Sequence, residues 1–115
     1  MEVFDITALR TCLNTRLIGR ELRYYPEVDS TNATALRLAA EWAVKGTVVV
    51  AETQHKGRGR AGKPWYSPPG LNLYLSVILR PTLEVRKVAL LTLIGSLAVA
   101  DAIDAEGGTV TSEVA

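Results

Sequence analysis

The chain is poor in residues that would cross-link it or anchor it in a membrane. It has one cysteine, Cys12, so an internal disulfide framework is excluded and a reducing compartment is indicated. The longest charge-free apolar run, residues 88–100, is 13 residues long and shorter than the ~18 of a membrane-spanning helix. We therefore expect a buried helix there and no membrane association. No basic start followed by an apolar core opens the chain, so no signal peptide is expected and the cytoplasm is the predicted location.

The composition is that of an ordinary globular protein. Hydrophobic residues make up 48% of the 115 residues and charged residues 22%, which argues against a disordered tail, a fibre and a coiled coil. This length allows one domain, and the sequence contains no internal repeat.

Acidic residues are absent between Glu52 and Glu84, although the net charge of the whole chain is only +1. The segment between them carries five positive charges: Lys56, Arg58, Arg60, Lys63 and Arg80. Such a local excess favours a phosphate or another anionic ligand over general adhesion to nucleic acid.

The hydrophobic pattern predicts helices and strands in alternation. In the first half we expect a short helix capped by Asp5 or Thr7, a strand over residues 21–25 that stops at Pro26, and a helix over residues 33–44. That helix would turn Leu36, Ala39, Ala40 and Ala43 to one face.

In the second half, residues 47–51 read as a strand buried on both faces and residues 71–80 as the clearest alternating strand, with its odd-numbered side chains on one face. A long apolar helix over residues 84–106 and the start of a strand over residues 109–114 complete the pattern.

Glycines punctuate the basic segment at residues 57–64. They satisfy G-x-G-x-x-G and most of the P-loop pattern, but both motifs need a helix to begin at the glycines, and here prolines and a strand follow. Glycine still lets the backbone approach a ligand, and the arginines are bidentate donors for phosphate or carboxylate. Trp65 and Tyr66 add flat surfaces for a ring. A solvated basic hairpin and a loop that binds single-stranded RNA are the alternatives.

Several blocks together resemble the biotin–protein ligase family. They are Asp29-Ser30-Thr31-Asn32 before a helix, residues 51–65 (AETQHKGRGRAGKPW), Ser67-Pro68-Pro69-Gly70, and Leu73-Tyr74-Leu75-Ser76 at the next strand. The resemblance covers residues 18–103 and depends on the combination of blocks. It implies an α+β fold, a mixed sheet flanked by helices of the class II aminoacyl-tRNA synthetase and biotin synthetase type. Residues 1–115 would then be the N-terminal portion of the catalytic domain.

The resemblance also implies an enzyme that activates biotin with ATP to biotinyl-adenylate, with Mg²⁺ as cofactor. The biotinyl group then passes to a lysine of a biotin carboxyl carrier domain. Arg58 and Arg60 would be the catalytic pair. The biotin-binding residues would be Ser30, Thr31, Asn32, Gln54, Gly57 and Arg58, and the adenylate would contact Arg58, Gly59, Arg60 and Trp65. No metal ligand and no DNA-binding domain are expected in this chain.

Some features leave alternatives open. Ser30 or Thr31 could serve only as a helix cap, and His55, where the family commonly has threonine, is interpreted as a loop residue facing solvent. The family's Lys-Trp-Pro-Asn-Asp block is absent, so we expect a truncated domain with impaired activity, a partly bare helix over residues 88–100 and a tendency to form homodimers. A non-catalytic biotin or adenylate binder is the alternative function. Lipoate–protein ligase ranks lower because its Arg-Arg-x-Ser-Gly-Gly-Gly stretch is missing.

Overall fold

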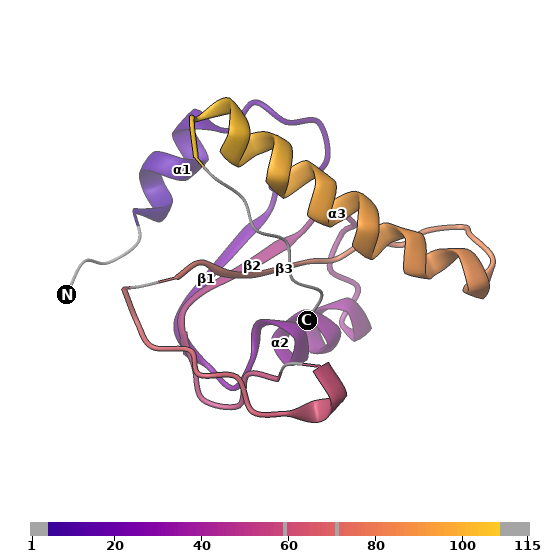
Figure 1. Ribbon diagram of the computed structural model, residues 1–115, viewed down its shortest axis with the longest axis horizontal. Coiled ribbons are helices and arrows are strands. Elements are labelled where there is room, and N and C mark those ends of the chain that lie inside the picture. The colour runs from indigo at the N-terminus through magenta and orange to yellow at the C-terminus, as the bar shows by residue number, and fades with distance from the viewer. Residues whose placement is uncertain (1–4, 59, 71, 109–115) are drawn as a thin grey trace. The chain divides into compact units, whose positions relative to one another are not determined.

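The computed structural model describes residues 5–58, 60–70 and 72–108 (Figure 1). The chain divides into two compact units, Met1–Arg80 and Pro81–Ala115. The first unit holds, in chain order, α1 (Ile6–Cys12), β1 (Leu22–Val28), α2 (Thr31–Ala40), β2 (Val48–Gln54), the 3₁₀ turn η1 (Arg60–Gly62) and β3 (Tyr74–Val77). The second unit holds α3 (Val85–Ala105). The predicted strand over residues 109–114 lies outside the described residues.

The first unit is built on a three-stranded mixed sheet in the order β1-β2-β3. β1 runs parallel to β2 with Leu22 opposite Val48, and β3 runs antiparallel to β2 with Val77 opposite the same residue. The α+β class, with a mixed sheet and flanking helices, is thereby confirmed.

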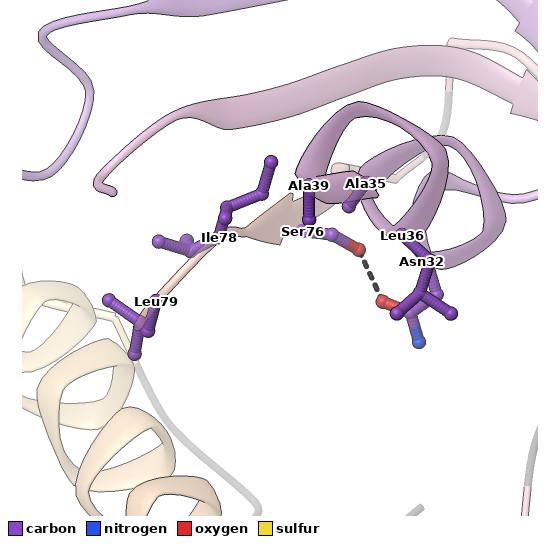
Figure 2. A pocket seen from close by; sticks show the side chains of 8 residues that line it. Asn32, Ala35, Leu36, Ala39, Ser76, Ile78 and Leu79 are labelled. Atoms are coloured by element: carbon purple, nitrogen blue, oxygen red, sulfur yellow. Dashed lines mark hydrogen bonds between the residues drawn. The ribbon is translucent and has the colours of Figure 1, made fainter. Parts of the chain in front are cut away.

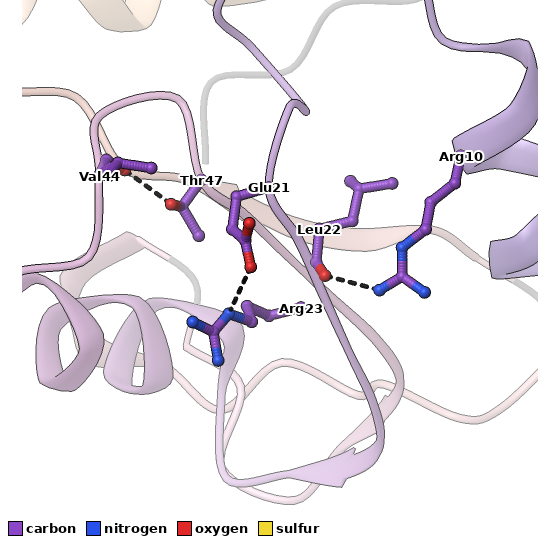
Figure 3. Close-up of polar contacts among 6 residues, drawn as sticks. All are labelled: Arg10, Glu21, Leu22, Arg23, Val44 and Thr47. Atoms are coloured by element: carbon purple, nitrogen blue, oxygen red, sulfur yellow. Dashed lines mark hydrogen bonds and ion pairs between the residues drawn. The ribbon is translucent and has the colours of Figure 1, made fainter.

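The central strand β2 is buried on both faces, as its run of β-branched residues predicts. Val48 and Val50 turn to one face and pack with Leu22 and with apolar side chains of α1. Val49, which is fully buried, turns to the other face and packs with residues of α2. Arg10 on α1 also donates to the Leu22 carbonyl at 2.8 Å (Figure 3), so α1 is fixed to the start of β1.

The strand β1 continues through Pro26, where the sequence predicts its end. The parallel register pairs Tyr25 with Ala51 and Glu27 with Thr53, and Pro26 has no partner in it. Proline lacks an N–H and is tolerated in a strand that need not donate at that position, as at the edge of a sheet. The added residues of the strand bring Val28 opposite Gln54, the last residue of β2.

The helix α2 ends at Ala40, four residues before the predicted end at Val44. Trp42 has a positive φ of 68°, which no helix accommodates. The predicted apolar face was partly wrong. Ala39 and Ala43 do pack against the core, but the buried positions of α2 are Thr31, Ala35 and Leu38, and Leu36 is 72% exposed.

The strand β3 spans Tyr74–Val77 and is shorter than the predicted residues 71–80. Its buried side chains are Tyr74 and, just beyond its end, Ile78, whereas Leu73, Leu75 and Leu79 are exposed. The buried side chains of this segment thus belong to the even-numbered set, and the alternation in the sequence left open which set would be covered. Alternation gives the period of a strand, and the neighbouring helix decides which face is covered: here Ile78 packs with Ala35 and Leu38 of α2.

The helix α3 agrees with its predicted bounds to within one residue, but none of its residues is buried. The prediction of a buried helix was wrong in this respect, and the prediction of bare apolar surface on it is confirmed. By length and composition alone, this helix could cross a membrane, because its few charges lie near its ends. Core helices of soluble proteins pass the same test.

Candidate functional site

The candidate site lies where the carboxyl ends of β1 and β2 meet. The parallel strands place Val28 beside Gln54, and the chain leaves β1 directly into the N-terminus of α2. The backbone N–H of Thr31 donates to Oε1 of Gln54 at 2.8 Å, across 23 residues of sequence. Two residues predicted to bind the same ligand are therefore in direct contact.

The amide of Gln54 also joins this edge of the sheet to the glycine-rich loop. Its Nε2 donates to Oγ of Ser67 at 3.1 Å, and that hydroxyl donates in turn to the Trp65 carbonyl at 3.2 Å. The Ser67 carbonyl accepts from the Gln54 backbone N–H and from the Thr53 hydroxyl. Ser67 is 4% exposed, and the sequence marked it only as part of a block. The loop is thus fastened to β2 at the point where it returns.

The glycine at position 57 leaves the space that this arrangement needs. A Cβ built on Gly57 would lie 2.8 Å from Nε2 of Gln54, 2.8 Å from Oγ of Ser67 and 3.1 Å from the Trp65 carbonyl oxygen. Any larger residue would displace the Gln54 and Ser67 side chains. The requirement for glycine here is one of room, since the structure assigns no unusual φ to this residue.

The start of α2 supplies three further polar side chains. Oγ of Ser30 accepts from the Ala33 N–H at 3.0 Å, so Ser30 is a helix cap, as its residue type allowed. The hydroxyls of Thr31 and Ser76 lie 2.8 Å apart, and Ser76 donates to Oδ1 of Asn32 (Figure 2). Ser76, on β3, stood in the sequence only as part of the block at residues 73–76 and was not predicted to contact a ligand.

A groove of about 340 Å³ opens beside Asn32 and Ser76, between α2 and β3 (Figure 2). Its other walls are aliphatic: Ala35, Leu36, Ala39, Val77, Ile78 and Leu79. The groove therefore has one polar end and apolar sides, which suits a ligand with a polar head and an apolar tail.

The glycine-rich loop folds back on itself. The Trp65 N–H donates to the Gly57 carbonyl at 2.7 Å, and the backbones of Arg58 and Pro64 form an isolated antiparallel β-bridge. Nη1 of the exposed Arg58 donates to the Gly62 carbonyl at 3.1 Å, and no ion pair among the described residues involves Arg58. A guanidinium has five N–H donors, so most of those of Arg58 remain for an anion.

The structure describes the other loop residues predicted to bind a ligand to different extents. Trp65 is 51% exposed. The backbone of Arg60 begins η1, and Gly59 lies outside the described residues. The turn η1 is only three residues long and a strand follows, which confirms that no P-loop or dinucleotide helix starts here.

Arg80 and His55 lie outside this loop. Arg80, counted with the basic segment, donates to the carbonyls of Ala39 and Ala43 at 3.0 and 2.6 Å, so it binds the C-terminal end of α2. The assignment of its charge to an anion site was wrong. His55 is exposed and pairs with Glu27 at 3.8 Å, which confirms its interpretation as a solvent-facing loop residue.

Within residues 5–58, 60–70 and 72–108, no group of three or more His, Cys, Asp or Glu side chains is placed to hold a metal ion. We therefore assign no magnesium ligand in this part of the chain.

Comparison with known proteins gives a consistent answer. Residues 24–114 match the biotin/lipoate A/B protein ligase family. The chain is 40% identical over 103 residues to the bifunctional ligase/repressor BirA of Bacillus spizizenii, covering 90% of this chain and 32% of that protein. It is 41% identical over 76 residues to the biotin–[acetyl-CoA-carboxylase] ligase of Paracoccus denitrificans, covering 65% and 30%. The chain thus spans about a third of the length of these relatives.

Solved structures agree. The biotin protein ligase of Leishmania major in complex with biotinyl-5-AMP superposes with a TM-score of 0.58 at 34% identity, covering 72% of this chain and 34% of that one. The Aquifex aeolicus biotin protein ligase in complex with biotin and ATP gives 0.52 at 38% identity, covering 74% and 36%. The predicted fold type and the resemblance to biotin–protein ligases are confirmed. The chain belongs to the biotin/lipoate A/B protein ligase family.

Proposed function

We propose that this chain binds biotin and ATP and carries biotin-activating residues of a biotin–protein ligase. In that reaction the biotin carboxylate attacks the α-phosphorus of ATP, pyrophosphate leaves, and a lysine amine of a biotin carboxyl carrier domain then displaces AMP from the biotinyl-adenylate. The named relatives and the two ligand complexes among the solved structures support this assignment.

The observation that carries the proposal is the contact between Thr31 and Gln54 at the open end of the sheet. Biotin has a ureido ring with N–H donors and a carbonyl acceptor, and an apolar tail. Gln54 and the start of α2 offer small polar groups of both kinds, and the neighbouring groove offers aliphatic walls. The chemistry of the site therefore matches the two halves of the ligand.

The glycine-rich loop supplies positive charge for the phosphate of the adenylate. Arg58 directly follows Gly57, which lies against Gln54, and Arg60 comes two residues later in the chain. Their guanidinium groups would stabilise the phosphate of the adenylate, and Trp65 would cover a ring. A loop that closes over the adenylate also excludes water, which protects this mixed anhydride from hydrolysis. Mg²⁺ neutralises the phosphates of ATP in such reactions, and no described residue is assigned to it.

A second candidate is a biotin or adenylate binder without catalytic activity. The contacts of Gln54 with Thr31 and Ser67 would serve binding alone equally well. In both cases we propose the cytoplasm as the location, and a carboxyl carrier domain as the partner of the catalytic form.

Calorimetry separates these candidates. Biotin is titrated into the 115-residue chain, ATP is added, and pyrophosphate release is measured. Gln54→Ala tests the site, and Asn14→Ala, which removes an exposed amide distant from it in sequence, is the control. Binding with pyrophosphate release supports the ligase, and binding without release supports the binder. Absence of biotin binding, or equal binding by Gln54→Ala, contradicts both.

A further inference from the structure

Ser67 is the buried polar residue at the centre of the site that the proposed function leaves without a role. Its hydroxyl lies between Nε2 of Gln54 and the carbonyl oxygen of Trp65, at 3.1 and 3.2 Å. We propose that Ser67 is a positioning residue: it sets the direction in which the Gln54 amide faces, and thereby the groups that Gln54 presents to biotin. This inference rests on the proposed function.

The donors and acceptors of the hydrogen bonds around the Gln54 amide can be assigned in only one way. The Thr31 backbone N–H can only donate, so the amide atom facing it at 2.8 Å is the oxygen Oε1. The NH₂ group must then face Ser67. The Ser67 hydroxyl donates its proton to the Trp65 carbonyl, which can only accept, and so turns a lone pair toward Gln54. A flipped amide would place two N–H groups against each other at Thr31.

The fixed direction of the Gln54 amide determines which of its donors and acceptors remain for a ligand. A carboxamide has two N–H donors and two acceptor lone pairs. Gln54 uses one of each, on Ser67 and Thr31, and keeps one N–H and one lone pair. A ureido group, which carries both a carbonyl and N–H groups, complements that remainder. A carboxylate, which only accepts, would satisfy half of it.

The surroundings of the Ser67 hydroxyl keep it in place. Ser67 is 4% exposed, and its carbonyl accepts from the Gln54 backbone N–H and from the Thr53 hydroxyl at 2.5 Å. The bare Cα of Gly57 fills the remaining space, since a Cβ there would lie 2.8 Å from both Oγ and Nε2. Loss of the hydroxyl would leave the amide held by the Thr31 N–H alone and its own N–H without an acceptor.

The chain offers a direct probe, because Gln54 is its one glutamine. Labelling with ¹⁵N-glutamine gives one side-chain NH₂ signal, read without any ligand. In the unmodified chain we expect one of its two protons to exchange slowly with water. Ser67→Ala should remove that protection and weaken biotin binding about tenfold, or about 1.4 kcal/mol. Ser67→Cys, which keeps the size but has a weak acceptor, should lie between them.

Thr47→Val is the matched control. Thr47 is fully buried at the opposite end of β2, and its hydroxyl donates to the Val44 carbonyl at 2.6 Å (Figure 3). Its loss should lower the melting temperature much as Ser67→Ala does, and should leave both the Gln54 amide signal and the biotin affinity unchanged. A role of Ser67 in stability alone would make the two variants indistinguishable.

A double-mutant cycle completes the test. If Ser67 acts through Gln54, Ser67→Ala added to Gln54→Ala weakens biotin binding no further. Additive losses, or an unchanged Gln54 amide signal in both Ser67 variants, would overturn the inference. If the unmodified chain does not bind biotin, the proposed function fails, and the amide signal still decides whether Ser67 orients Gln54.

Discussion

Gly57→Ala should loosen the candidate site more than any other single added methyl group. The new Cβ would lie 2.8 Å from Gln54 Nε2 and from Ser67 Oγ, whereas ordinary van der Waals contact begins at 3.4 Å. Each atom must therefore move by about 0.6 Å, the difference between the two distances. The bonds at 3.1 and 3.2 Å around Ser67 would then break. At about 1 kcal/mol each, the free energy of unfolding falls by roughly 2 kcal/mol.

Urea unfolding followed by tryptophan fluorescence measures this loss, and a biotin titration measures its effect on binding, which we expect to weaken at least about tenfold. Gly62→Ala is the control in the same loop. Its Cβ would meet no atom within 4 Å, so only its φ of +74° opposes the change, at about 1–2 kcal/mol. Biotin affinity should survive Gly62→Ala. Equal biotin affinity in the unmodified chain and Gly57→Ala would refute the close approach described for Gly57.

Four other outcomes are expected. Arg60→Gly should increase the biotinyl-adenylate released into solution during turnover; no increase would show that Arg60 does not retain it. Gly95→Ala, in open space on α3, should raise stability by about 1 kcal/mol in thermal unfolding, because alanine favours a helix. If the exposed face of α3 forms dimers, Leu97→Glu on that face should lower the mass measured by sedimentation, and an unchanged mass would rule out dimers through that surface.

The fourth outcome concerns alkaline pH. Burial, with a hydrogen bond to Glu52, raises the pKa of Tyr24 above 10.0. The unfolded chain then loses this proton at a lower pH than the folded chain, so stability is full below about pH 10 and falls above it. Tyr24→Phe should lack this part of the fall. Parallel stability curves for the two proteins from about pH 8 to 11 would contradict it.

Local signals made much of this structure predictable. Asp5 and Ser30 are caps whose side chains accept from the third residue of their helices, and such bonds depend on neighbouring residues alone. The run of β-branched residues in β2 likewise sufficed to predict a strand buried on both faces. The convergence of Thr31 and Gln54 followed from the resemblance, and parallel pairing of β1 and β2 explains it.

Tertiary contacts decided the features that the sequence left open. Leu36 and Ala35 are apolar neighbours on α2, and Ala35 is the one that packs with Val49 and Ile78. Arg80 reads as one more charge of a basic segment until the fold brings it to the carbonyls of α2. Ser67 gave no signal of its own, because its role depends on an amide 13 residues away.

Binding of biotin at Gln54 can be observed at that side chain. The ¹⁵N-labelled NH₂ signal of the single glutamine is followed while biotin is added to the 115-residue chain. We predict that the signal shifts and saturates at one biotin per chain, and that Asn14→Ala behaves identically. A signal that stays in place while calorimetry records biotin binding would show that biotin binds elsewhere, and the proposed site would be wrong.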